Sequence, residues 1–167
     1  NEIPYESEYA KEFANQFFMM VNFYSIKRSM EISKVKGAFK DFEKSEYAKG
    51  NYFNKYIEND YTAKSDKVKD LFEGMHIPTK NDWIELSKDV KKYGLYNAYR
   101  LTIAPTQSIG YIQNATPSIG PITEQIERRT YGDSTTYYPM PNLSKENLLL
   151  YKSAYKMDMF KIIDLMS

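Results

Sequence analysis

Residues 104–122 read APTQSIGYIQNATPSIGPI and combine hydroxyl side chains with proline and glycine, without one charged residue. Because 27% of the whole chain is charged, this uncharged segment is unusual for the protein. Thr106 and Ser108 lie two positions apart, so a tight turn after Pro105 would direct both hydroxyls at one ligand. Hydroxyls and backbone N–H groups at such a turn can bind phosphate without side-chain cations. The same composition also fits an ordinary surface turn, so the chemistry alone leaves both interpretations open.

The elements on either side of this segment should position it. AYRLTIA, at 98–104, alternates between apolar and polar residues, which predicts a strand that ends at the segment. Gly110 would remove side-chain bulk where a ligand or a neighbouring backbone approaches closely. The sequence EQIERRTYGDSTTYYPMP, at 124–141, predicts a hairpin that turns at Gly132 and Asp133.

Most of the remaining chain is expected to be helical. The predicted helices and helical turns are 6–36, short turns from Ser45 and from Asn51, 65–75, 79–94, 144–155 and 158–166. One strand and one hairpin make a poor sheet, so we expect part of a larger fold. Unpaired strand edges predict self-association of the isolated piece, and the last helix lacks a C-cap, which favours a polypeptide cut at that point.

The helix after Thr79 has the clearest boundaries. Asp82 follows Thr79 at the spacing of a capping box, and Gly94 is a typical C-terminal residue. Between them, Trp83 and Val90 belong to one apolar face. The pattern therefore predicts a helix with both ends specified by the sequence.

Composition excludes several functional classes. At 167 residues and 42% hydrophobic content the chain fits one domain. A net charge of +1 disfavours nucleic acid and anionic membranes as partners. No apolar run approaches the roughly 18 residues of a spanning helix, and the acidic N-terminus is unlike a signal peptide. We expect a cytoplasmic protein with no membrane partner and no direct nucleic-acid contact. With no cysteine, the chain holds no thiolate nucleophile, disulfide or cysteine-bound metal.

Three other features receive structural interpretations. His76 is the only histidine and lies near no cluster of ligand residues, so we expect an ordinary loop residue and no metal site. Tyr137 and Tyr138 are interpreted as structural residues of the hairpin. Arg128 and Arg129 are interpreted as a solvated or subunit-facing charge pair, and not as a phosphate site.

The segment at 104–122 resembles the substrate-phosphate loop of the large (alpha) subunit of class I ribonucleotide reductases, especially the class Ib form. Further stretches resemble successive segments of that subunit in the same order: FFMMVNFYSIKRSMEISK, FEKSEYAKGNYFNKYI, SDKVKDLFEGMHIPTKNDWIELSKDVKKYGLYNAYRLTIAP and TTYYPMPNLSKENLLLYKSAYKMDMFKIID. The resemblance covers nearly the whole chain. It implies an α/β fold: a C-terminal-half fragment of the ten-stranded α/β barrel, predominantly helical with a few strands. Its parts would be helical 1–94, a strand, phosphate loop and hairpin at 95–141, and helical 142–167.

The resemblance also implies which residues bind substrate. In the family, the loop closes over the diphosphate of a ribonucleoside diphosphate with backbone amides and hydroxyls. Carried over by position, the binding residues are Pro105, Thr106, Gln107, Ser108 and Ile109. Of these, Thr106 and Ser108 would supply hydroxyls, and Gln107 mainly its backbone.

Three neighbouring residues would support the loop. Gly110 stands where relatives generally have serine, so one hydroxyl is lost relative to the family pattern. Asn114 and Thr116 belong to a shared stretch that is expected to fix the loop from behind.

Reduction of ribonucleoside diphosphates for DNA synthesis is the activity that the resemblance implies. The family uses a cysteine thiyl radical and a cysteine pair, so this chain should hold no catalytic residue, bind no cofactor and be inactive alone. The implied partners are alpha-subunit segments carrying the cysteines, a radical-generating beta subunit with a dimetal-tyrosyl radical, and a thioredoxin-like or glutaredoxin-like reductant. ATP binding and allosteric control would involve segments outside this chain. The alternative is a non-catalytic nucleotide-phosphate-binding module or an inactive reductase remnant.

Overall fold

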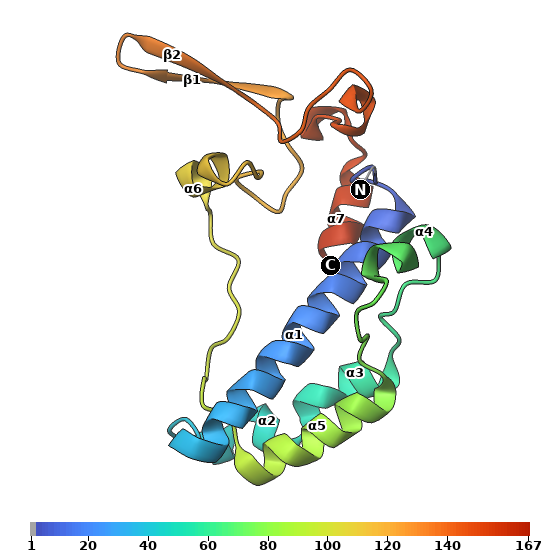
Figure 1. The fold of residues 1–167 in the computed structure, drawn as a ribbon, viewed down its shortest axis with the longest axis vertical. Coiled ribbons are helices and arrows are strands. Elements are labelled where there is room, and N and C mark those ends of the chain that lie inside the picture. The colour runs from blue at the N-terminus through green and yellow to red at the C-terminus, as the bar shows by residue number, and fades with distance from the viewer. Residues whose placement is uncertain (1–2) are drawn as a thin grey trace. The chain divides into compact units, whose positions relative to one another are not determined.

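The computed structural model describes residues 3–167, which form two compact units. One unit is Glu12–Thr102, and the other combines residues 3–11 with Ile103–Ser167. The long helix α1 (Glu8–Lys36) begins in the second of these units and continues through the first. Figure 1 shows α1 as the blue helix. Helix α1 confirms the helix expected over 6–36.

The Glu12–Thr102 unit is helical. Besides α1, its helices are η1 (Phe42–Lys44), α2 (Glu46–Lys49), η2 (Asn51–Phe53), α3 (Asn54–Glu58), α4 (Asp66–Lys69), η3 (Asp70–Phe72) and α5 (Lys80–Tyr93). The helical turns expected from Ser45 and Asn51 are therefore confirmed, whereas the helix expected over 65–75 is shorter and ends as a 3₁₀ turn.

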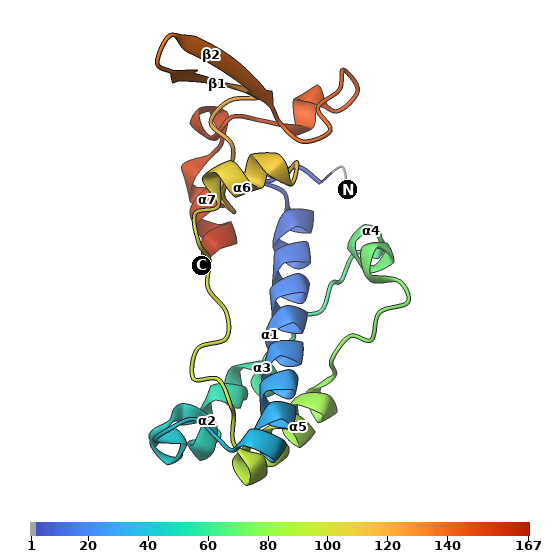
Figure 2. The ribbon, with the colours of Figure 1, turned by 60° about the vertical axis from the view of Figure 1, so that its left-hand side comes forward.

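Helix α5 lies beside the C-terminal half of α1 in both views (Figures 1 and 2). The Phe23 ring meets the Trp83 ring edge-on at 5.0 Å, and the Ser33 hydroxyl donates to the Tyr93 carbonyl at 2.6 Å. Apart from Met140, every buried apolar side chain of residues 3–167 lies in this unit. This unit therefore contains the hydrophobic core.

The ends of α5 are as the sequence predicts. The Thr79 hydroxyl accepts from the Asp82 N–H at 3.3 Å, and the Asp82 carboxylate accepts from the Thr79 N–H at 2.7 Å. These two bonds form the capping box. Gly94 follows the last turn with φ of +75°, in the left-handed region that favours glycine.

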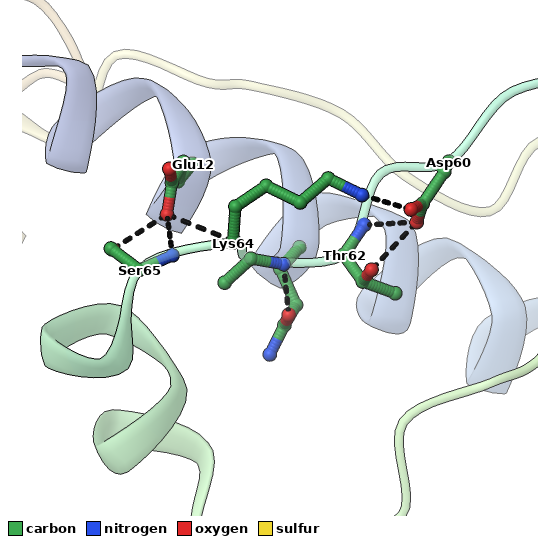
Figure 3. Close-up of polar contacts among 7 residues, drawn as sticks. Glu12, Asp60, Thr62, Lys64 and Ser65 are labelled. Carbon is green, nitrogen blue, oxygen red and sulfur yellow. Dashed lines mark hydrogen bonds and ion pairs between the residues drawn. The ribbon is translucent and has the colours of Figure 1, made fainter.

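The segment that connects α3 and α4 is held against α1 by a carboxylate (Figure 3). Glu12 on α1 accepts from the Ser65 hydroxyl at 2.7 Å, from the Ser65 N–H at 3.0 Å and from the Lys64 N–H at 3.2 Å. Within the same segment, the Asp60 carboxylate accepts hydrogen bonds from the N–H and the hydroxyl of Thr62 and forms an ion pair with Lys64. Bonds to Lys64 and Thr62 lower the pKa of Asp60 to about 2. These contacts fix a stretch that has no regular structure of its own.

The second unit is less regular and has little core. Its elements beyond the start of α1 are α6 (Gln107–Ile112), β1 (Ile126–Tyr131), β2 (Ser134–Pro139), η4 (Leu148–Leu150), η5 (Ala154–Lys156) and α7 (Met159–Met166). Strands β1 and β2 pair antiparallel with Tyr131 opposite Ser134, and Gly132 between them has φ of +57°. The expected hairpin and the helix expected over 158–166 are confirmed.

Residues 3–11 join this unit through polar contacts. The Lys11 ammonium pairs with the Asp164 carboxylate at 2.7 Å, Lys152 pairs with Glu6, and the Tyr5 hydroxyl donates to a backbone carbonyl at 3.0 Å. The pairs are exposed or half-buried, so each contributes little free energy.

The strand expected over 98–104 is wrong for this structure. These residues form no strand, with a bend at Ala98, and the only sheet among residues 3–167 is the two-stranded one. Tyr99 is 95% exposed and Ile103 is 65% exposed. The alternating pattern describes a chain that can pair, but a strand forms only where a neighbouring strand accepts its hydrogen bonds.

The continuous helix expected over 144–155 is also wrong. This stretch forms turns and the two short helices η4 and η5. The Gln125 side chain donates to the Leu148 carbonyl at 2.9 Å and to the Tyr151 carbonyl at 3.0 Å. Side-chain contacts from the start of the hairpin thus take carbonyls that a longer helix would use internally.

A candidate phosphate-binding segment

The five predicted substrate-binding residues lie at the start of α6. Pro105 follows the stretch 98–104, Thr106 precedes the first helical residue with φ of −90° and ψ of −19°, and Gln107, Ser108 and Ile109 form the first turn. The placement of the Gln107 side chain lies outside what the structure describes. Ser108 is exposed, and the Ile109 side chain is 59% exposed. The segment is thus a short helical turn on the surface of its unit, where a ligand can reach it.

Thr106 is tied to the chain beyond α6. Its hydroxyl donates to the Pro117 carbonyl at 3.2 Å, and its N–H donates to the same oxygen at 3.4 Å. Its own carbonyl accepts from the Ile109 N–H at 2.9 Å. The hydroxyl contact is long for an O–H···O bond, which is typically near 2.8 Å. Rotation of this hydroxyl toward a ligand would therefore forfeit only a weak bond.

Gly110 is buried against the chain's own backbone. A Cβ at this position would lie 3.1 Å from the Pro117 Cα and 3.3 Å from the carbonyl oxygens of Ala115 and Thr116. Of the two roles considered for Gly110, the close approach seen here is to a neighbouring backbone. No positive φ is involved, so the requirement is one of space.

Asn114 ends α6 in the left-handed conformation, with φ of +50°. The Asn114 N–H donates to the Tyr111 carbonyl at 3.2 Å, and the Ala115 N–H donates to the Gly110 carbonyl at 2.8 Å. This pair of bonds is the Schellman pattern. Just beyond it, the Thr116 hydroxyl donates to the Ser118 carbonyl at 3.1 Å. The stretch after α6 therefore folds back under the helix and fills the space beside Gly110.

The hairpin contacts α6 through one aromatic and charged cluster. Figures 1 and 2 both show α6 below β1 and β2. The Tyr111 hydroxyl donates to Glu127, and the Nε and a terminal nitrogen of Arg129 each lie 2.8 Å from the other Glu127 oxygen. The Arg129 guanidinium lies 4.7 Å from the Tyr111 ring centroid, and the Tyr138 ring stacks on Tyr111 at 4.5 Å. We call these four residues the Tyr111 cluster.

The cluster changes the acidity of its members. Partial burial and then the hydrogen bond to Glu127 raise the pKa of Tyr111 to about 12. The bonds from Tyr111 and Arg129 lower the pKa of Glu127. At neutral pH the cluster therefore holds a neutral phenol, a carboxylate and a guanidinium, which is the combination that its hydrogen bonds require.

The two arginines, interpreted from the sequence as a solvated or subunit-facing charge pair, lie in different environments. Arg128 is exposed, as expected, but Arg129 pairs with Glu127 inside the cluster. Adjacent residues of a strand point to opposite faces, which separates their environments. Tyr138 stacks within the cluster, while Tyr137 is 62% exposed.

Sequence reasoning did not identify Tyr111 or Glu127. The sequence did contain a signal for Glu127. A two-residue turn at Gly132 and Asp133 fixes the hairpin register, and this register places Glu127 opposite Tyr138. What the sequence could not provide is the approach of α6 to that face of the hairpin.

Neither a membrane span nor a metal cluster emerges from the described part of the chain. None of its helices is both long and apolar enough to cross a membrane. No group of three potential ligands among histidine, aspartate and glutamate comes together within residues 3–167. His76 is exposed, with its Nε2 3.4 Å from an Asp82 carboxylate oxygen.

Comparison with known proteins gives one consistent result. A family model described as "Ribonucleotide reductase, barrel domain" matches residues 1–167. The ribonucleoside-diphosphate reductase subunit alpha of Bacillus subtilis is 56% identical over 100% of this chain, and the subunit alpha of Mycoplasma pneumoniae is 39% identical over 99% of it. The subunit alpha of Treponema pallidum is 30% identical over 93% of it. The chain spans 24% of the length of the first two relatives.

Proposed function

Because the chain belongs to the ribonucleotide reductase barrel-domain family, we propose that it serves as the part of a reductase alpha subunit that binds the substrate diphosphate. The chain is a fragment of the α/β barrel of that family. The proposed ligand is the diphosphate of a ribonucleoside diphosphate, and the proposed contacts are residues 105–109. The observation that carries the proposal is the exposed helical turn that contains Thr106 and Ser108. This turn lies in a chain whose residues 1–167 all match the family.

The chemistry of this segment suits phosphate. Thr106 and Ser108 offer hydroxyl donors, and the backbone of residues 107 and 108 offers N–H donors in the first turn of α6, whereas the Ile109 N–H already donates to the Thr106 carbonyl. Phosphate oxygens accept such bonds without a nearby cation. Gly110 keeps the backbone behind the turn close to the chain at 115–117, so the segment has a fixed base.

The reactive groups belong to other segments. The chain has no cysteine, so thiyl-radical chemistry and dithiol oxidation require residues outside it. We propose that this chain binds and orients the diphosphate while those segments carry the cysteines. A radical-generating beta subunit and a thioredoxin-like or glutaredoxin-like reductant are the proposed partners. We also propose that the enzyme is cytoplasmic. ATP binding and allosteric control would involve segments of the enzyme outside this chain.

The test uses the complete alpha subunit that contains this segment, assayed with its beta subunit. In the double variant Thr106→Val and Ser108→Ala, the KM for a ribonucleoside diphosphate should rise on the order of a hundredfold, because two hydroxyl contacts to a charged group, each worth at least about 1.5 kcal/mol, are lost. Thr130→Val, in the exposed hairpin, is the matched control and should leave KM unchanged.

Two results would contradict the proposal. One is an unchanged KM in the double variant. The other is an equal loss of affinity for the diphosphate substrate and for the corresponding nucleoside, measured by calorimetry, since a phosphate site must discriminate between the two.

A further inference from the structure

The segment proposed to bind phosphate has little packing of its own. Thr106, Ser108 and Ile109 are exposed, and α6 is only six residues long. A helix of this length is not stable by itself. The direction in which its first turn presents hydroxyls and N–H groups must therefore be set by contacts that other residues make with α6.

The Tyr111 cluster supplies such contacts from the hairpin. Tyr111 lies two residues after Ile109, and its ring is held by Tyr138 at 4.5 Å and by the Arg129 guanidinium at 4.7 Å. Its hydroxyl is held by Glu127. The Tyr111 side chain is thus fixed both at its ring and at its polar end.

The hairpin is built to present these groups together. Glu127 pairs directly with Tyr138 across the strands, and Arg129 follows Glu127 by two residues, so all three lie on one face. Within β1, Glu127 and Arg129 are half-buried while Arg128 is exposed. The side chains of Glu127 and Arg129 retain 28% and 26% of their exposure, so their pairing is stronger than a fully solvated one.

We propose that the hairpin braces the phosphate-binding segment through the Tyr111 cluster, with Tyr111, Glu127 and Arg129 as positioning residues for substrate binding. This inference rests on the proposed function, since it concerns the orientation of residues 105–109. The positioning residues do not touch the diphosphate. They set the angle of α6, so their loss weakens binding of the diphosphate and raises KM more than it lowers kcat.

The experiment compares two neighbouring arginines in the complete alpha subunit with its beta subunit. Arg129→Gln and Arg128→Gln remove the same charge from adjacent positions of β1, but only Arg129 belongs to the cluster. Arg129→Gln should raise the KM for a ribonucleoside diphosphate on the order of fivefold, with kcat changed less than about twofold. Arg128→Gln should leave both constants unchanged.

A second variant, Tyr111→Phe, tests the same cluster in case Arg129→Gln does not fold. Tyr111→Phe keeps the ring and its stacking but loses the hydroxyl that Glu127 accepts. It should raise KM in the same direction, and the double variant Tyr111→Phe with Arg129→Gln should be less harmful than the product of the two single effects, because both act through Glu127.

Specific outcomes would overturn the inference. If Arg129→Gln and Arg128→Gln show the same KM while the Thr106 and Ser108 double variant still raises it, the hairpin brace is wrong and the phosphate segment stands. Equal losses in kcat and kcat/KM, together with a lower thermal midpoint, would indicate a role in stability alone and also reject the brace. If the Thr106 and Ser108 double variant leaves KM unchanged, the proposed phosphate-binding function is wrong, and the inference about the hairpin, which rests on it, is wrong as well.

Discussion

Gly110 shows how a single residue can be constrained by space. The backbone at 115–117 lies so close that a Cβ would contact Pro117 Cα at 3.1 Å. That backbone is itself fixed by the bond from the Ala115 N–H to the Gly110 carbonyl. A neighbour that is hydrogen-bonded into place cannot move aside cheaply. The resemblance to the family marked Gly110 as a departure from serine, and the structure gives the departure a steric consequence.

We expect Gly110→Ala to loosen the turn after α6. The added methyl group favours helix by about 1 kcal/mol, but the crowding against 115–117 costs about 1–3 kcal/mol. Amide hydrogen exchange of residues 110–117 should therefore accelerate, on the order of fivefold, where it reports local opening. Gly120→Ala is the control, because the nearest atom to its Cβ would be the Ser118 hydroxyl oxygen at 3.4 Å. Equal exchange rates in both variants would show that the backbone at 115–117 yields without cost.

At the scale of elements, the best predicted pieces are those whose signals are local. The capping box at Thr79 and Asp82 and the turn at Gly132 both formed as the sequence indicated. The strand expected over 98–104 and the continuous helix expected over 144–155 did not form. For these two, the deciding hydrogen bonds come from residues far away in the sequence, such as Gln125 for the second.

The contact between Glu12 and the segment before α4 predicts a pH effect on stability. Hydrogen bonds from the hydroxyl and N–H of Ser65 and from the Lys64 N–H lower the pKa of Glu12 below its ordinary value of 4.5. A lowered folded-state pKa means that the stabilisation is complete above the ordinary pKa and is lost as the pH falls through the folded value. Acidification below about pH 4.5 should therefore weaken this contact.

Glu12→Gln tests this because the amide oxygen can still accept but does not titrate. The urea midpoint, followed by the fluorescence of the single tryptophan Trp83 in the same unit, should shift less between about pH 6 and about pH 3 in the variant than in the parent chain. Glu43→Gln, at an exposed position in η1, is the control and should retain the parent's pH dependence. An identical pH dependence in the Glu12 variant would argue against the predicted linkage.

At the scale of the whole molecule, the core is unevenly distributed. The Glu12–Thr102 unit buries nearly all of the apolar side chains that are buried, while the other unit leaves many apolar residues at its surface. In α7, Met159 is 71% exposed and Phe160 is 81% exposed. Apolar surface of this extent is typical of contact with other protein segments. This agrees with a chain that spans 24% of the length of the Bacillus subtilis subunit alpha.

Activity should therefore depend on complementation. The 167-residue chain alone should reduce no ribonucleoside diphosphate, because it has no thiol. Mixed with a polypeptide that carries the remaining alpha-subunit segments, and supplied with beta subunit and reductant, it should restore turnover above either piece alone. The same mixture with the Thr106 and Ser108 double variant is the control and should need more substrate. A complementing mixture that binds the chain but never turns over would contradict the proposed role.

The sequence by itself determined the family, the absence of thiols, the long first helix, the capped helix after Thr79 and the hairpin that turns at Gly132 and Asp133. The helices and the hairpin depend on residue identity and spacing within a few positions, where local sterics and hydrogen bonds decide. The absence of thiols is a matter of composition, and the family rests on a resemblance along nearly the whole chain. Only the tertiary structure decided that 98–104 lacks a strand partner among the described residues, that Gly110 faces its own backbone, and that Arg129 turns inward to Glu127 and Tyr111. These outcomes depend on which distant segment arrives beside each residue, and a linear pattern does not contain that information.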